Sequence, residues 1–239
     1  MNHYTAFAVP KDKGKQFEFV AISNAVSTNH KFDSYQFGFK KGHSTGLCTS
    51  AVKQTIEYYT SHGSHFFACF VDFTKAFDRV NYWKLFNQLL SDGVDLIFVR
   101  LLVFWYTEQQ GYVRWRNVIS DFFLIGNGTK QGGVLSPYLF TRYVRDIIAN
   151  IVQSCTGCAI GNVFTNIFAY ADDMILLAPS WAAMQQLLDL LHFYCEELDI
   201  VCNSKKTVCM MFKPRCKDKI VADEFPPFSK SETDVCRQI

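Results

Sequence analysis

The sequence lacks a long uninterrupted hydrophobic stretch. Its most apolar segment, residues 94–106, is broken by Asp95 and Arg100, whereas a membrane-spanning helix needs about 18 consecutive apolar residues. The first residues also lack the basic start and apolar run of a secretory signal peptide. We therefore expect an intracellular protein, in the nucleus or the cytoplasm, that does not act at a membrane.

Charged residues are also scarce, at 19% of the chain, and the sequence has no internal repeat and no low-complexity tract. Hydrophobic residues make up 49% and aromatic residues 16%. This composition excludes a disordered or linker-type protein, because such proteins are poor in hydrophobic residues and rich in charge. The 239 residues correspond to one large domain or two small ones.

The nine cysteines lack the pattern of a disulfide framework or of a structural zinc site. Their number is odd and most lie inside apolar runs, which predicts free thiols in the core. Cys155 and Cys158 have the spacing of a zinc knuckle, but no second pair at a matching spacing accompanies them.

The net charge of +2 hides a difference between segments. Residues 1–60 contain seven basic and four acidic residues, whereas residues 141–212 contain four basic and seven acidic residues. A basic part next to an acidic part fits a polyanion-binding face beside a cation site. Imbalances this small also arise by chance.

Hydrophobic periodicity predicts helices that alternate with strands. The predicted helices cover residues 47–61, 81–90, 94–106, 136–152 and 181–198, and the predicted strands cover residues 66–71, 164–170, 174–178 and 208–212. Residues 112–115 and 121–125 are expected to pair as strands across residues 116–120. The pattern predicts an α+β fold, with helices packed on one face of a largely antiparallel sheet.

Three acidic residues stand at the ends of predicted strands. Asp72 follows the apolar run of residues 66–71, and Asp172 and Asp173 lie at the turn between two apolar strands. Carboxylates at such places are costly without partners, and Mg²⁺ prefers hard oxygen ligands of this kind. Two such ions can activate an attacking oxygen and stabilise a leaving one. The alternative is a solvated turn, because aspartate is a common turn residue.

The segments around these acids carry a family resemblance. FVDFTKAFDRVNYWKL, GTKQGGVLSPYLF, YADD followed by MILLA, and LDIVCNSKKTVCMMF occur in this order, and QFGFKKGHST precedes them. Each resembles a sequence block of reverse transcriptases, most closely those of non-LTR (LINE-type) retrotransposons. The resemblance covers residues 17–213 and implies a right-hand polymerase palm with partial fingers.

The resemblance also implies an activity and a set of partners. The chain would be an RNA-directed DNA polymerase that uses two Mg²⁺ ions, for which Mn²⁺ is a possible substitute. It would bind an RNA template, a DNA primer and a deoxynucleoside triphosphate. Asp72, Asp172 and Asp173 match the catalytic metal ligands of the family, with Asp172 the surer direct ligand, and Phe73 would offer a backbone carbonyl.

Further residues take roles from the same resemblance. Phe77 matches the bulky residue whose ring excludes a 2′-hydroxyl, and its alternative is a core aromatic. Gln131 and Gly132 match residues at the incoming nucleotide or template, and their alternative is a plain glycine-rich turn. Lys206 matches a lysine that protonates the leaving pyrophosphate or neutralises its charge. Lys205 is its neighbour, and a solvated lysine is the alternative.

The resemblance fails at both ends of the chain. We expect residues 1–60 to form a partial fingers segment, residues 61–212 the palm and residues 213–239 a loose tail. A fingers block resembling YRPISL, a thumb and an endonuclease part, normally in the same polypeptide, are not found, so the sequence is interpreted as a truncated copy. The alternative function is therefore an inactive remnant that at most binds RNA or a partner. An RNA-directed RNA polymerase is disfavoured by Phe77.

Overall fold

The computed structural model describes residues 34–130 and 132–214. The described residues form two compact units, one of residues 77–130 and 132–143 and the other of residues 34–76 and 144–214. We call their described parts the helical unit and the sheet unit.

The described residues before residue 60 belong to the sheet unit, and the predicted boundaries after residues 60 and 212 stay predictions. The assignment of fingers and palm to parts of the chain stays a prediction. Gln131, residues 1–33 and residues 215–239 lie outside the described residues, so predictions that fall on them have no structural counterpart here.

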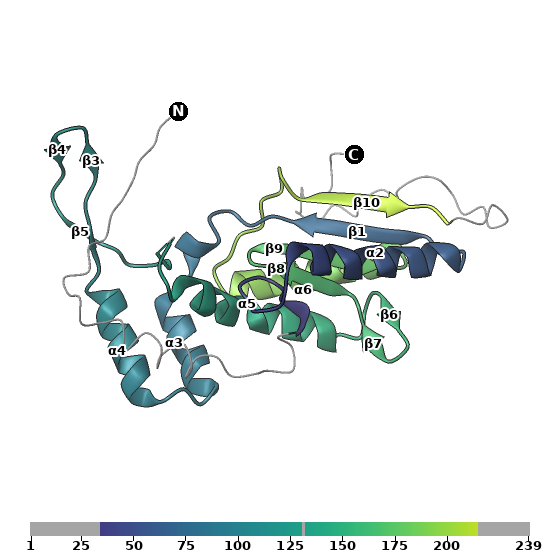
Figure 1. The fold of residues 1–239 in the computed structure, drawn as a ribbon, viewed down its shortest axis with the longest axis horizontal. Coiled ribbons are helices and arrows are strands. Elements are labelled where there is room, and N and C mark those ends of the chain that lie inside the picture. The colour runs from purple at the N-terminus through teal and green to yellow at the C-terminus, as the bar shows by residue number, and fades with distance from the viewer. Residues whose placement is uncertain (1–33, 131, 215–239) are drawn as a thin grey trace. The chain divides into compact units, whose positions relative to one another are not determined.

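The sheet unit is built on a four-stranded antiparallel sheet (Figure 1). Its strands are β1 (Phe66–Val71), β8 (Ile167–Tyr170), β9 (Asp173–Ala178) and β10 (Val208–Phe212), and their order is β10-β1-β9-β8. Strands β8 and β9 form the predicted hairpin, and β1 and β10 have the predicted bounds. The α+β class and the antiparallel sheet are confirmed.

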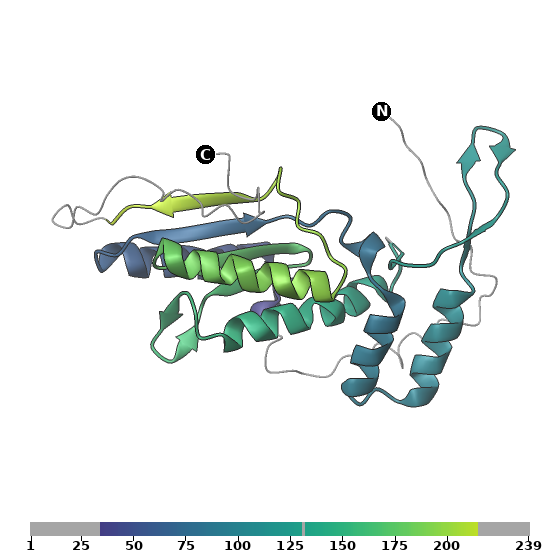
Figure 2. The same cartoon turned by 180° about the vertical axis from the view of Figure 1, so that it is seen from behind.

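Two helices cover opposite faces of this sheet. Neighbouring residues of a strand point to opposite faces: the ring of Phe66 contacts Tyr59 of α2 (Thr45–Ser61), and the ring of Phe67 contacts Trp181 of α6 (Trp181–Glu197). Figure 1 shows α2 in front of the sheet, and Figure 2 shows α6 in front from behind. The expectation that helices cover one face is therefore wrong. The apolar run of β1 is buried on both sides, so both faces need a cover.

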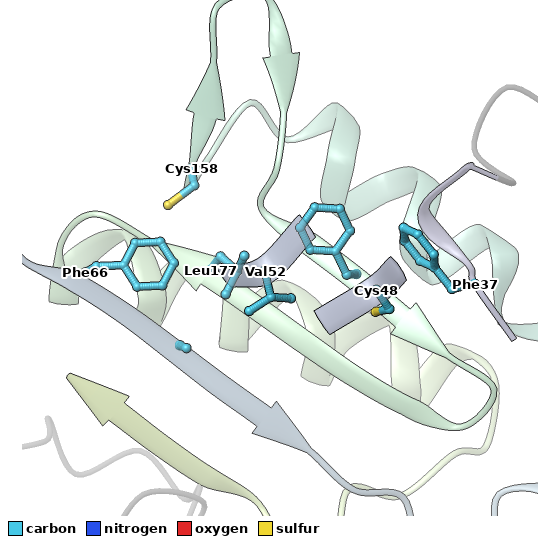
Figure 3. Close-up of a cluster of buried hydrophobic side chains, with 8 residues drawn as sticks. Phe37, Cys48, Val52, Phe66, Cys158 and Leu177 are labelled. Atoms are coloured by element: carbon cyan, nitrogen blue, oxygen red, sulfur yellow. The ribbon is translucent and has the colours of Figure 1, made fainter. Parts of the chain in front are cut away.

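The core under α2 is a cluster of buried apolar side chains (Figure 3). Cys48 and Val52 of α2 meet Phe66 of β1 and Leu177 of β9 there. Ser44 fixes the start of α2 by accepting a hydrogen bond from the backbone N–H of Leu47 at 3.2 Å, as Ser180 does for Ala183 at the start of α6. These caps and this cluster hold α2 on the sheet.

The sheet unit also contains a short hairpin that the sequence did not predict. Strands β6 (Ala159–Ile160) and β7 (Val163–Phe164) pair with each other, and two-residue strands are too short to show a period in the sequence. The seven cysteines within the described residues carry free thiols, as predicted. Cys155 is exposed while Cys158 is buried.

The helical unit begins with a single turn, η3 (Phe77–Arg79), followed by α3 (Tyr82–Ser91) and α4 (Leu96–Thr107). Asn81 and Asp95 cap these helices, so both begin within two residues of their predicted starts. Helix α5 (Ser136–Gln153) begins in this unit and runs into the sheet unit. Among residues 34–130 and 132–214, none of the helices combines the length and apolar character needed to cross a bilayer.

A two-stranded ribbon completes the helical unit. Strand β2 (Gln110–Gly111) pairs with β5 (Phe123–Leu124), and β3 (Arg114–Trp115) pairs with β4 (Val118–Ile119). The predicted pairing across residues 116–120 is therefore wrong in its turn, which consists of Arg116 and Asn117. Arg116 adopts a φ of 54°, a conformation that glycine usually marks in a sequence, and no glycine stands there.

Replacing Leu177 with alanine should lower the free energy of unfolding by about 2–5 kcal/mol, because the fully buried side chain would leave a cavity. Urea unfolding followed by circular dichroism measures this change. The control is Met210→Ala on β10, where the side chain is 45% exposed and the expected change is about 0.5 kcal/mol or less. Equal losses in the two variants would contradict the packing of the cluster.

Candidate active site

The hairpin of β8 and β9 carries the paired acids at its tip. Tyr170 pairs with Asp173 across the hairpin, so Ala171 and Asp172 form a two-residue turn and Asp173 opens β9. Ala171 adopts a φ of 58°, which lies in the left-handed region. The turn therefore places two consecutive carboxylates at one end of the sheet, as predicted.

Strand β1 brings Asp72 to the same end. Val71, the last residue of β1, lies opposite Met174 of β9, so Asp72 and Asp173 are neighbours across the two strands. Both line a pocket of about 470 Å³, together with Tyr170 and Lys206. The pocket is also lined by Thr45, Cys48, Thr49, Phe70, Val71, Met174 and Ile175. Two carboxylates that are far apart in the sequence, those of Asp72 and Asp173, thus share one cavity.

Asp172 is predicted to be a direct metal ligand, but it does not line this pocket. It is half-buried in the turn and is not among the residues that line the pocket, whereas Asp173 is. Asp172 belongs to the two-residue turn, whereas Asp173 opens β9 and pairs with Tyr170, which also lines the pocket. The family resemblance favours Asp172 as the surer ligand, and its role stays a prediction.

The loop between α6 and β10 holds Asp72 in place. The side-chain amide of Asn203 donates to Asp72 Oδ2 at 3.0 Å, and the backbone N–H of Asn203 donates to the Asp72 carbonyl at 2.8 Å. The hydroxyl of Thr207 accepts from the Asp72 N–H at 3.3 Å. Sequence reasoning missed Asn203 and Thr207, because a polar residue in a loop predicts only a turn and their partner lies far away in the chain.

Lys206, rather than Lys205, lies at this pocket. Its ammonium is 3.8 Å from Asp72 Oδ2, with the lysine side chain 69% exposed and the aspartate side chain 31% exposed. A pair this open to water contributes at most about 1 kcal/mol to stability. Lys206 therefore keeps a mobile positive charge beside the carboxylates instead of locking them into an ion pair.

The carboxylates repel one another. The pKa of Asp173 is raised, first by partial burial, then by the negative charges of Asp172 and Asp72, while Lys206 acts in the opposite direction. A raised pKa means that the ionised form of Asp173 is disfavoured at this place. A cation near Asp173 would relieve the repulsion.

The donor set fits Mg²⁺ that shares its shell with substrate. Within residues 34–130 and 132–214, no group of three or more histidine, cysteine, aspartate or glutamate side chains is arranged to hold a metal ion on its own. Mg²⁺ is commonly bound by one or two carboxylates, with water and substrate phosphates completing its shell. Asp72 and Asp173, which line one pocket, could supply the two carboxylates of such a site.

Phe73 packs into the core behind Asp72. Its side chain is 5% exposed, its backbone forms a bridge with Cys202, and the next N–H, that of Thr74, donates to the carbonyl of Val201 at 2.8 Å. These contacts fix the backbone immediately after Asp72. The predicted role of the Phe73 carbonyl stays a prediction.

Phe77 and Gly132 belong to the helical unit. The ring of Phe77 stacks on Phe140 at 4.3 Å between centroids, and its carbonyl accepts from the Thr129 N–H at 2.8 Å. Gly132 has a φ of 80°, and a Cβ there would meet nothing within 4 Å. The structure therefore requires glycine at this position for its backbone conformation, and the predicted approach of a nucleotide stays a prediction.

Comparison with known proteins shows the family of the chain. Residues 5–233 match the family "Reverse transcriptase (RNA-dependent DNA polymerase)". The chain is 26% identical over 217 residues to the Pol polyprotein of the type-2 retrotransposable element R2DM from Drosophila melanogaster. The aligned region covers 90% of this chain and 20% of that protein. It is 25% identical over 214 residues to the RNA-directed DNA polymerase from the mobile element jockey of Drosophila funebris. That aligned region covers 86% of this chain and 23% of that protein.

The fold is similar to that of a solved structure at low sequence identity. Apo telomerase from Candida tropicalis, truncated from its C-terminal domain, superposes with a TM-score of 0.62 at 11% identity, over 86% of this chain and 41% of that one. The chain spans about a fifth of the length of the retrotransposon proteins that it matches. Matched over almost its whole length, the chain belongs to the reverse transcriptase family.

Proposed function

We propose that this chain is the polymerase part of a non-LTR retrotransposon reverse transcriptase. It would transfer a nucleotide from a deoxynucleoside triphosphate to the 3′-hydroxyl of a DNA primer, directed by an RNA template. The observation that carries the proposal is the pocket in which Asp72, Asp173 and Lys206 meet. Two carboxylates with the exposed ammonium of Lys206 beside them suit the binding of a triphosphate and its metal ions.

The proposed site uses Asp72, Asp172 and Asp173 to hold two Mg²⁺ ions. When bound, these ions would supply activation of the attacking hydroxyl and stabilisation of the leaving oxygen. Asn203 fixes the orientation of the Asp72 carboxylate through its hydrogen bond to Oδ2. A carboxylate that is already oriented loses less conformational entropy when it binds a ligand.

Lys206 would act on the leaving group. Its ammonium lies at the pocket and is exposed enough to move, so it can approach the negative charge that develops on pyrophosphate and donate a proton to it. Phe77 would select deoxynucleotides by excluding the 2′-hydroxyl, and Gln131 and Gly132 would contact the nucleotide or template. These three roles rest on the family resemblance.

Primer extension on poly(rA)–oligo(dT) with dTTP and Mg²⁺ tests the activity. Asp72→Asn and Asp172→Asn should each lower incorporation by at least about 100-fold, because each removes a charge that the metal ions need. The matched control is Asp189→Asn on the exposed face of α6, which should leave incorporation unchanged. Folded wild-type protein that incorporates no more than Asp72→Asn would favour the inactive remnant.

Asn203→Ala should lower incorporation by about 10–100-fold, as expected when a hydrogen bond that orients a metal ligand is lost. Asn150→Ala is the control, because it also removes a hydrogen bond donated by a side-chain amide, at 2.8 Å to the Asp146 carbonyl on α5, away from the pocket. Steady-state kinetics with Mg²⁺ as the varied component measure both variants. Equal effects in the two variants would show that Asn203 matters only for stability.

The raised pKa of Asp173 predicts the direction of a titration shift. In metal-free protein, Asp172→Asn or Asp72→Asn should lower the pKa of Asp173, because each removes a repelling charge, and Lys206→Met should raise it. A group whose folded pKa is raised destabilises the folded state above that pKa, and this penalty disappears as the pH falls through it. Carboxyl-carbon NMR titration measures the shifts, with Asp189 as internal reference. An unchanged Asp173 pKa in all three variants would refute the coupling.

A further inference from the structure

A segment that the proposed mechanism does not use lies against the turn that carries the paired acids. Gln36, in the QFGF block, forms a parallel bridge with Ala169 of β8, and the backbone N–H of Phe37 donates to the Ala169 carbonyl at 2.7 Å. Gln36 is only 3% exposed. The block therefore continues the sheet beyond β8 and ends beside the hairpin tip.

The side-chain amide of Gln36 bonds to both backbone groups of one turn residue. Its Oε1 accepts from the Ala171 N–H at 2.9 Å and from the Gly38 N–H at 2.8 Å. Its Nε2 donates to the Ala171 carbonyl at 3.0 Å. A single amide thus holds the peptide groups on either side of Ala171, immediately before Asp172.

Ala171 needs such support because its conformation is unfavourable. Its φ of 58° costs a residue with a Cβ about 1 kcal/mol, and hairpin turns usually place glycine or asparagine there. The sequence of the turn alone does not select its shape.

Gly38 supplies an independent observation. A Cβ at this position would lie 2.3 Å from the Ala171 nitrogen and 2.9 Å from the Ala171 Cα, closer than any real contact. The backbone at Gly38 therefore packs directly on the backbone of the turn. Gln36 bonds to the turn while Gly38 leaves the space for it.

We infer that Gln36 is a positioning residue that fixes the tip of the β8–β9 hairpin so that Asp172 and Asp173 are held toward Asp72 before any metal ion or nucleotide arrives. The inference rests on the proposed function, since it concerns the same three carboxylates. Among the described residues, the hydrogen bonds of the Gln36 side chain go to backbone groups and not to a carboxylate. Gln36 therefore acts on the acids through Ala171.

The wild-type protein alone provides a first test. Arg116 is the first residue of another two-residue hairpin turn and has nearly the same φ, 54°, but it is exposed. We expect the Ala171 amide to exchange its hydrogen at least about tenfold more slowly than the Arg116 amide, after correction for intrinsic rates. Equal protection of the two amides would contradict the inference that Gln36 fixes the turn at Ala171.

The second test compares Gln36→Met with Tyr35→Phe. Methionine keeps the length of the side chain without its three hydrogen bonds, and Tyr35→Phe removes a 3.0 Å bond from the neighbouring residue to the Phe164 carbonyl, away from the turn. Gln36→Met should accelerate exchange at Ala171 and raise the Mg²⁺ concentration for half-maximal primer extension by about 10–100-fold. Tyr35→Phe should do neither. Gly38→Ala, which displaces the turn and keeps Gln36, should act like Gln36→Met.

The outcomes separate the inference from the proposed function. If wild-type protein extends primers and Gln36→Met has the Mg²⁺ dependence of Tyr35→Phe, the positioning role is overturned and the proposed function stands. If folded wild-type protein neither extends primers nor binds Mn²⁺ in a manner that Asp72→Asn abolishes, the proposed function is overturned and the positioning role with it. In that case, hydrogen exchange at Ala171 measures only whether the hydrogen bonds between Gln36 and Ala171 form.

Discussion

Mutual repulsion of carboxylates is the constraint on which the site depends. Asp72, Asp172 and Asp173 are brought together at one end of the sheet, and the pKa of Asp173 shows that this gathering is unfavourable when no cation is present. The protein opposes the repulsion with neutral hydrogen bonds instead of a tight ion pair. Asn203 and Thr207 hold Asp72, and Gln36 holds the residue before Asp172. Lys206 stays 3.8 Å from Asp72 Oδ2 and exposed, so it does not neutralise the carboxylates in a close ion pair.

The same arrangement explains why the sheet has both faces covered. Strand β1 ends next to the partly buried carboxylate of Asp72. It is held in place by packing against α2 on one face and α6 on the other. The acids then occupy the one end of β1 and β9 where the apolar residues stop. Hydrophobic packing fixes the strands, and hydrogen bonds from loops fix the acids, so the two jobs are carried out by different residues.

The sequence predicted what local pattern determines. The helices at residues 47–61 and 181–198 have strong apolar stripes and serine caps, and the strands at residues 66–71 and 208–212 are short apolar runs, so both were found nearly to the residue. The ribbon turn at Arg116 was misplaced, because its left-handed residue is not glycine. The face covered by α2 was missed, because periodicity shows a helix's apolar side but not the surface that it meets. Asp72 and the acid pair came from motif and strand position, whereas Asn203 and Gln36 have no local signal, since their partners are 131 and 135 residues away.

Those long separations also order the events of folding. Asp72 directly follows β1, while its partners Asn203 and Thr207 precede β10, the last strand along the described chain. Contacts so distant in sequence form late, because a large loop must close before they are gained. The hairpin of β8 and β9 closes locally and early, with its two acids still far from the third. We therefore expect the carboxylates to confront one another only in the final docking step, when most of the apolar surface that outweighs their repulsion is already buried.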